Sequence, residues 1–256
     1  RDGTSFTGSA SLNSGSIVRQ DLRESSPGIS SWAGIYSAIF QVNNFIYQVE
    51  KADYLVTADK SYYLGQAYGL RAFYYFQLYR TYGRVPLAKE PKVAITTPST
   101  AADAYLPRTA TEKETLDFIK EDVNKSVASF SGNYTTKMQK AQWSLGASQM
   151  LQAEVYLWSA KVKIDGATPT TTVADLAIAR AAVEAVIPKY SLQPSFANVF
   201  NSAATAAIKG NNEIIFAMRY GFGEASNNYS QFIYAITDAL SGYVDDKGVA
   251  IPASDP

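Results

Sequence analysis

Residues 61–91 read SYYLGQAYGLRAFYYFQLYRTYGRVPLAKEP, and this stretch decides the fold. Its aromatic side chains occur on almost every side of a predicted helix at 59–82, with Asp59 as the N-cap. Gly83 is expected to end that helix in the left-handed conformation, and Pro86 prevents its continuation. A helix that is apolar all round lies either in a protein core or in a membrane.

The polar residues of this helix favour the protein core. An arginine near the centre of a bilayer costs at least about 2.5 kcal/mol, so we predict the central element of a soluble helical stack. Gly65 and Gly69 are then expected to let a neighbouring backbone approach closely. Arg71 is expected to reach a carboxylate or the carbonyls at a helix end, because a buried guanidinium without partners is strongly destabilising. The run is interrupted by Gln66, Arg71, Gln77 and Arg80.

Composition removes several classes of function. The chain has 256 residues, no cysteine and no histidine, so thiol catalysis, cysteine-ligated zinc and histidine general bases are excluded for this sequence. Its 23 basic and 23 acidic residues balance, and no basic run predicts nucleic-acid binding. We therefore expect no metal, no cofactor and no nucleic-acid partner.

Four further helices are predicted from apolar periodicity, at 31–51, 111–130, 144–162 and 174–187. Thr111 and Glu114 form a capping box, in which Glu114 would reach back to the Thr111 amide. The helix at 111–130 has one narrow apolar stripe and is interpreted as a surface helix. Asn43 interrupts the apolar face of the helix at 31–51 and is expected to bond a neighbouring helix or loop.

The inward face of the helix at 174–187 is predicted to carry Leu176, Ala179, Val183 and Ile187. Residues 211–220 alternate in polarity and predict a short strand. The fold class is therefore mainly α, with tetratricopeptide-like helical hairpins, long irregular loops and a few short strands. We expect one domain over 1–256, divided into a loop region at 1–28, a helical core at 29–190 and a mixed region at 191–256.

Four tracts resemble one protein family in the same order. The tract at 65–91 resembles the Leu-Arg-Ala-Phe, aromatic-pair and Tyr-Gly…Val-Pro-Leu pattern of the SusD/RagB-like outer-membrane nutrient-binding lipoproteins. Glu154 stands where that family usually has arginine, which puts the ion pair normally made there in doubt. The other matching tracts are WAGIYSAIFQVNNFI (32–46), ASQMLQAEVYLWSA (147–160) and YSLQPSFANVF…NNEIIFAMRY (190–220).

The resemblance implies a tetratricopeptide-like scaffold without catalytic activity. Members of this family lie on the outward face of the outer membrane and are lipid-anchored through an N-terminal cysteine, which is not present in this sequence. They cap a TonB-dependent, SusC-like transporter and deliver oligo- or polysaccharides, in some cases peptides, for uptake. Because members are considerably longer, we expect a segment that lacks both ends of the complete protein.

Candidate ligand residues follow the predicted strand. A sugar site needs flat aromatic faces and planar amides, and the segment after residue 219 supplies both. Arg71, Gly83 and Pro86 are interpreted as structural residues. The candidate ligand contacts are Tyr220, Phe222, Asn227, Asn228 and Tyr229.

Two other functions stay open. The chain could be a helical adaptor that binds only proteins, without a small-molecule ligand. A helical glycosidase would need two facing carboxylates roughly 5 to 9.5 Å apart. Glu121 and Asp122 are adjacent on a helix and point to different faces, so they do not form such a pair.

Overall fold

The computed structural model describes residues 31–92, 106–137, 139–195, 198–199, 212–217 and 248–249. The chain divides into two compact units, Arg1–Ser31 together with Arg219–Pro256, and Trp32–Met218. Almost all of the described residues belong to the second unit, which carries the helices.

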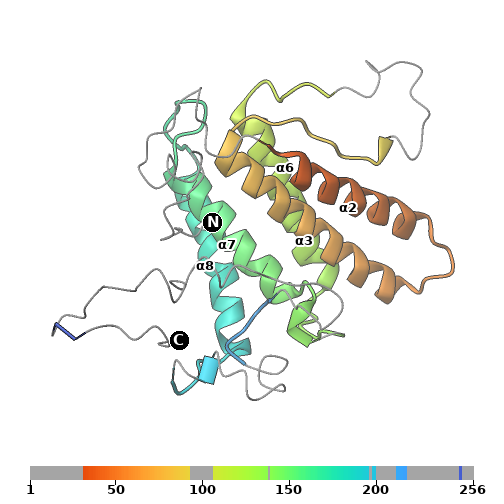
Figure 1. Cartoon of the computed structure of the whole chain (residues 1–256), viewed down its shortest axis with the longest axis vertical. Helices are drawn as coiled ribbons and strands as arrows, with labels where there is room; N and C mark the ends of the chain where they lie inside the picture. The colour runs from red at the N-terminus through yellow and green to blue at the C-terminus, as the bar shows by residue number, and fades with distance from the viewer. Residues whose placement is uncertain are drawn as a thin grey trace. The chain divides into compact units, whose positions relative to one another are not determined.

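The second unit is a stack of helices, which confirms the predicted fold class (Figure 1). Helix α3 packs against α2 on one side and α6 on the other, and α7 packs against α6 and α8. Within the described part, no helix combines the length and the apolarity needed to cross a membrane. The elements are α2 (Ala33–Lys51), α3 (Thr57–Tyr82), α6 (Glu112–Phe130), η1 (Gln139–Ala141), α7 (Leu145–Lys161), α8 (Thr172–Val186) and η2 (Ile187–Lys189).

Helix α3 lies in the interior of this stack. Tyr75, Phe76 and Leu78 are fully buried in its C-terminal half. The rings of α3 meet neighbouring rings edge to face, with centroids 5.2 Å apart between Tyr75 and Phe118. Such pairs stabilise by about 0.5–1.5 kcal/mol beyond the burial of their area. The tyrosine-rich helix is therefore the central packing element.

The predicted N-cap of α3 is wrong. The helix begins at Thr57, and Val56 precedes it without a side-chain cap. Asp59 lies in the first turn, where its carboxylate pairs with Lys137 at 2.8 Å. An acid in the first turn still favours the helix, because it faces the positive end of the helix dipole.

Gly83 ends α3 in a different conformation from the predicted one. Its φ of 68° is positive, but its ψ of −111° lies outside the left-handed helical region. The Gly83 amide donates to the Tyr79 carbonyl at 2.9 Å, which closes the last turn. Only glycine adopts this backbone conformation readily.

The space beside the two glycines inside α3 is filled by side chains rather than by a neighbouring backbone. A Cβ at Gly65 would lie 3.0 Å from the ring of Phe130. A Cβ at Gly69 would lie 2.0 Å from Nε1 of Trp143 and 2.8 Å from Oγ of Ser126. The glycines therefore admit bulky rings, one from α6 and one from the segment before α7.

Helix α6 is not the surface helix that its narrow apolar stripe predicted. Thr115, Asp122 and Ser126 are fully buried on it. Ser126 donates to the Gly65 carbonyl at 2.5 Å and bonds Ser148 at 2.7 Å. The apolar stripe alone underestimates the buried face of α6, because polar residues that are small or paired are buried beside it.

The ends of α6 follow the predicted capping only in part. Thr111 accepts a hydrogen bond from the Glu114 amide at 3.1 Å, as a capping box requires. The Glu114 carboxylate accepts from the Ala110 amide, not from Thr111. On the outer face, Glu121 and Lys125 form an ion pair 2.6 Å apart.

On the predicted inward face of α8, Ala179 is buried and Leu176 and Val183 are half-buried, so the prediction is wrong only at Ile187. Ile187, expected inside, is 65% exposed.

The predicted strand is absent from the residues described. Residues 212–217 form a turn and irregular backbone. The Ala217 amide donates to the Lys140 carbonyl at 2.9 Å, a single bond that makes no ladder. In the described ranges the only β-pairing consists of two isolated bridges, Pro86 with Arg108 and Ile164 with Ala167.

A buried carboxylate joins three helices. Asp175 on α8 accepts hydrogen bonds from Thr171 at 2.7 Å, from Ser159 on α7 at 2.8 Å and from Lys120 on α6 at 3.1 Å. Burial alone raises the pKa of Asp175, but these donors outweigh it and hold the pKa below its usual value of 3.8. The ionised form is therefore the one that the fold stabilises.

This carboxylate predicts a loss of stability in acid. Because its folded pKa is depressed, its stabilisation is present above the unfolded value and is lost as pH falls from about 4 through the folded pKa. In urea titrations, the difference in unfolding free energy between the parent chain and Asp175→Asn should be constant at pH 6 to 7 and shrink below pH 4. A difference that does not vary with pH would contradict this assignment.

Candidate functional site

The predicted ligand contacts lie outside the described part of the chain. These residues are Tyr220, Phe222, Asn227, Asn228 and Tyr229. Two other features of the helical unit are candidates for function: a segment that several side chains tie down at the end of α3, and an apolar groove beside α7 and α8.

The segment after α3 is fixed by bonds from buried side chains. Arg71 lies at the centre of this network, with 5% of its surface exposed. Its Nε and Nη2 donate to the two carboxylate oxygens of Asp122 at 2.6 and 2.8 Å. Its Nη1 donates to Oδ1 of Asn43 at 2.8 Å and to the carbonyl of Lys89 at 3.0 Å.

The side chains of Arg71 and Asp122 are both buried. Burial lowers the pKa of Arg71, and the Asp122 carboxylate more than restores it, so that this pKa stands above its ordinary value. Two parallel N–H···O bonds from one guanidinium to one carboxylate give the strongest geometry for such a pair. The rings of Tyr68 and Phe118 lie 5.5 and 5.2 Å from the guanidinium carbon and cover it further.

Tyrosines and Asn43 hold the same segment from α2 and α3. Tyr36 donates to the Pro86 carbonyl at 2.6 Å. Tyr75 donates to the Ala88 carbonyl at 3.0 Å and accepts from the Ala88 amide at 2.7 Å, while Asn43 donates to the same carbonyl at 2.7 Å. Burial raises the pKa of both phenols, so they stay protonated donors. This network fixes the backbone and leaves no side chain directed at a ligand.

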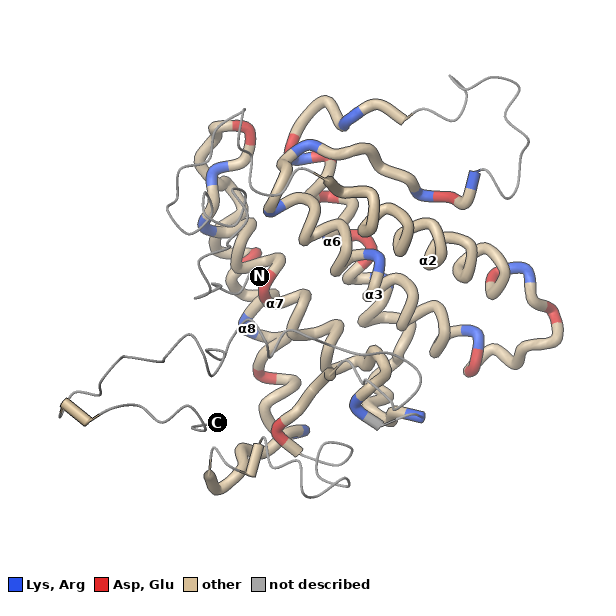
Figure 2. Tube along the Cα trace, in the orientation of Figure 1, with Lys and Arg blue, Asp and Glu red and all other residues tan. Residues whose placement is uncertain are grey.

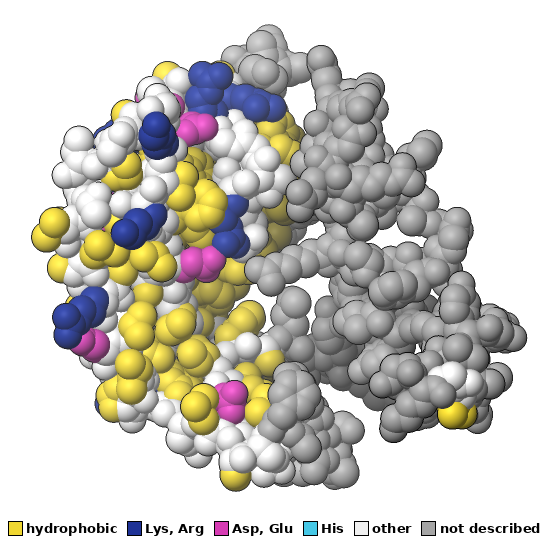
Figure 3. All heavy atoms as spheres, turned by 90° about the vertical axis from the view of Figure 1, so that its left-hand side faces the viewer, with side chains coloured by type: hydrophobic (Ala, Val, Ile, Leu, Met, Phe, Trp, Pro, Cys, Tyr) yellow, Lys and Arg dark blue, Asp and Glu magenta, His cyan; other side chains and the backbone are white. Residues whose placement is uncertain are grey.

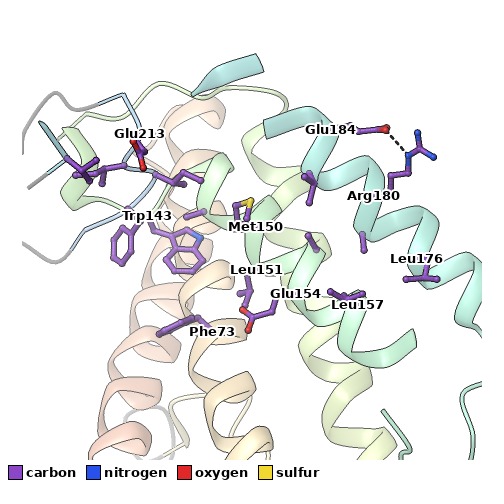
Figure 4. Close-up of a pocket in the computed structure, with 18 residues that line it drawn as sticks. Phe73, Trp143, Met150, Leu151, Glu154, Leu157, Leu176, Arg180, Glu184 and Glu213 are labelled. Carbon is purple, nitrogen blue, oxygen red and sulfur yellow. Dashed lines mark hydrogen bonds and ion pairs between the residues drawn. The ribbon is translucent and has the colours of Figure 1, made fainter. Parts of the chain in front are cut away.

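The second candidate feature is the apolar groove beside α7 and α8, which has a volume of about 1220 Å³ (Figure 4). Figure 3 shows apolar side chains gathered on the described surface of this side of the molecule. It is bounded by α7, α8 and residues 213–216, with Phe73 from α3 at one end. Exposed apolar side chains stand in its wall, among them Met150 at 40% and Leu157 at 49% exposure. Its apolar lining is Phe73, Trp143, Ala147, Met150, Leu151, Ala153, Leu157, Leu176, Ala179, Val183, Val199, Ile214, Ile215 and Phe216.

Aromatic rings close one end of the groove. The indole of Trp143 packs against Phe73 and Phe216, with centroids 5.8 and 5.4 Å apart. Its Nε1 donates to Ser148 at 2.8 Å, and only 5% of the residue is exposed. Trp143 therefore belongs to the core and presents no free face to a sugar.

The charged residues of the groove pair with other residues. Arg180 bonds Glu184 at 2.7 Å along α8. Glu154, which stands at the family's usual arginine position, pairs with Arg80 at 2.5 Å. Glu213 accepts from the Gln193 amide at 2.7 Å. A mainly apolar lining with its charges already paired suits apolar packing rather than sugar hydroxyls.

The sequence carries a signal for each of these two features. Asp122 follows Ile119 by three residues, which places it on the buried face of α6, although we treated it only as a neighbour of Glu121. Helix α7 is apolar all round, and such a helix needs a cover on every side. Met150 and Leu157 lie on the side of α7 where the groove opens.

Comparisons with known proteins agree on one family. Residues 4–157 match the model of a SusD-like family, which is described as starch-binding and associating with the outer membrane. A SusD-like protein of Formosa agariphila is 36% identical over 115 residues, which are 44% of this chain and 21% of that protein.

Solved structures align over nearly the whole chain. A SusD superfamily protein of Bacteroides fragilis is 34% identical with a TM-score of 0.79, over 98% of this chain and 49% of that one. NanU of the same organism is 31% identical with a TM-score of 0.77, over 96% and 47%. The chain thus spans about half the length of these solved relatives. It belongs to the SusD-like family of starch-binding proteins that associate with the outer membrane.

Proposed function

We propose that this protein captures glycans on the outward face of the outer membrane and hands them to a TonB-dependent, SusC-like transporter. The observation that carries the proposal is the match of residues 4–157 to a starch-binding family that associates with the outer membrane. In this proposal a lipid on an N-terminal cysteine, outside these 256 residues, anchors the protein to the membrane.

The helical unit acts as a rigid frame in this proposal. Its core is tied by the Arg71–Asp122 pair and by the Asp175 cluster, which connect helices far apart in sequence. Ligand groups held on such a frame lose little conformational freedom on binding, which favours capture. Basic and acidic residues are interspersed along the described helices (Figure 2).

We place the glycan contacts at Tyr220, Phe222 and Tyr229, whose rings stack on sugars, and at Asn227 and Asn228, whose amides bond hydroxyls. The groove beside α7 supports this placement by contrast, because its charges are paired and its tryptophan ring is packed between two phenylalanine rings.

Alanine in place of the three rings, Tyr220, Phe222 and Tyr229, should weaken glycan affinity by at least about tenfold, since each stacking contact contributes about 0.5–1.5 kcal/mol. Titration calorimetry measures this loss. Tyr54→Ala is the matched control, because this tyrosine is 83% exposed in the loop between α2 and α3. Equal affinity of the triple variant and the control would reject this placement of the site.

The function itself is tested on the complete protein with a panel of soluble starch, other oligo- and polysaccharides, and oligopeptides. Titration calorimetry should detect binding of at least one glycan. Long incubation with that glycan should release no reducing sugar. Binding of peptides alone would make it a peptide-binding member of the family. Absence of any small-molecule binding, with capture of a soluble protein partner, would favour the adaptor function.

The transporter is tested separately. Affinity capture of the complete protein from solubilised outer membranes should bring down a TonB-dependent transporter in stoichiometric amount. Recovery of the protein without any such transporter, under conditions that preserve glycan binding, would reject this part of the proposal.

A further inference from the structure

The turn between α7 and α8 contains a sequence that can change chemically. Asp165 and Gly166 form the tip of this turn, and both residues are exposed. Asp-Gly occurs at two places in the sequence, here and at residues 2–3, and Asn-Gly does not occur. Because glycine has no side chain to shield its amide, an aspartate that precedes glycine is open to attack by the next nitrogen of its own backbone.

This reaction needs no enzyme and no reactant besides water. The Gly166 nitrogen attacks Cγ of the protonated Asp165 carboxyl group, the amide hydrogen leaves with the hydroxyl as water, and a five-membered cyclic imide forms. Water then opens the ring at the carbonyl of the original main chain. The product is isoaspartate, whose mass is unchanged, whose backbone has one extra methylene and whose free carboxylate is attached to Cα.

The first turn of α6 holds the Asp165 carboxylate in its unreacted form. Oδ1 accepts from the Glu112 amide at 2.7 Å, and Oδ2 accepts from the Lys113 amide at 3.1 Å. These amides have no acceptor within their own helix, and the helix dipole favours a negative charge beside them. Formation of the imide removes one carboxyl oxygen as water, so at least one of the two bonds must be lost first.

The geometry of the turn requires the labile sequence. Ile164 and Ala167 bond each other across the tip at 3.2 and 2.9 Å. The angle φ is 52° at Asp165 and 77° at Gly166. A two-residue turn with positive φ at both positions favours Asp-Gly. The turn thus fixes the pair of residues that can isomerise.

We propose that Asp165 is a site of spontaneous isoaspartate formation, and that the first turn of α6 sets the rate by holding its carboxylate. Isomerisation moves the carboxylate away from the two α6 amides. It also strains the return bond, in which Oε2 of Glu112 accepts from the Asp165 amide at 3.0 Å. The product therefore loosens the connection between this turn and α6. The inference does not depend on the proposed glycan or transporter.

Lys113→Pro tests the proposal in the complete protein. Proline lacks the amide hydrogen that Asp165 accepts, and the first turn of a helix tolerates proline. Lys113→Ala is the matched control, because it removes the same exposed ion pair with Asp117 and keeps the amide. Each protein is incubated for several weeks in one buffer and then digested. Liquid chromatography with mass spectrometry separates and quantifies the aspartate and isoaspartate peptides that contain residue 165.

Isoaspartate at residue 165 should form about tenfold faster in Lys113→Pro than in Lys113→Ala, since one hydrogen bond to a charged group is lost. Equal rates in the two folded variants would overturn the role of α6. Absence of isoaspartate at residue 165 even in the parent protein held unfolded in urea would overturn the site itself. If circular dichroism shows that Lys113→Pro does not fold, the parent protein decides: faster isomerisation in urea than in buffer supports the restraint, and equal rates contradict it.

Discussion

Replacing Asp122 by alanine should lower the free energy of unfolding by about 3–5 kcal/mol. The carboxylate accepts two bonds from Arg71, and its side chain is fully buried on α6. Removal leaves a guanidinium charge inside the core without its counter-ion, which is far more costly than the loss of an exposed pair. Urea denaturation followed by circular dichroism at 222 nm measures the loss.

Two controls separate the charge from other effects. Glu121→Ala removes the neighbouring carboxylate, which pairs with Lys125 on the outer face, and should cost less than about 1 kcal/mol. The double variant Arg71→Met with Asp122→Leu should be markedly more stable than Asp122→Ala, because no charge remains buried. If Asp122→Ala were no more harmful than Glu121→Ala, the pair would not stabilise the fold.

Gly69→Ala should destabilise the protein by about 1–3 kcal/mol, although alanine is the better helix former. The added Cβ would lie 2.0 Å from Nε1 of Trp143 and 2.8 Å from Oγ of Ser126. The indole cannot move away freely, because it is bonded to Ser148 and packed between Phe73 and Phe216. The melting temperature and the urea midpoint should both fall.

Gly34 provides the matched control for this substitution. It lies in the first turn of α2, and a Cβ there would meet nothing within 4 Å. Gly34→Ala should therefore be neutral or slightly stabilising, by at most about 1 kcal/mol. Equal effects at the two glycines would mean that the ring of Trp143 does not occupy the space beside Gly69.

The sequence predicted the helices and the centre of the fold well, because apolar periodicity and aromatic density report burial directly. It identified α3 as the interior helix and Arg71 as a residue in need of a carboxylate. It did not identify the partner, Asp122, because an ion pair between α3 and α6 depends on how two helices cross. It misjudged α6 for a related reason, since its buried Thr115 and Ser126 are polar.

Helix ends and faces were less predictable. Asp59 was expected to cap α3, but the chain enters the helix two residues earlier, and the carboxylate pairs with Lys137. Ala179 is buried on α8 as expected, but Ile187, also expected inside, follows the end of α8 and is 65% exposed. The predicted strand at 211–220 had no neighbouring strand within the described residues, and alternation alone does not make one.

The groove shows what a single sequence leaves open about a site. Apolar residues on every side of α7 were evident, but the sequence did not show which of them a neighbour covers. The predicted glycan residues at 220–229 lie outside the described residues, so their placement stays a prediction. The family match, in contrast, follows from four tracts in the expected order and is shown by the comparison over residues 4–157.

Hydrogen exchange of the backbone amides tests the central claim, that α3 is the interior helix around which this family member is built. The amides of Tyr75, Phe76 and Tyr79 should be among the slowest to exchange, with opening free energies close to that of global unfolding. The amides of α8, which packs mainly on α7, should exchange sooner. Exchange in the middle of α3 as rapid as in α8 would contradict the account.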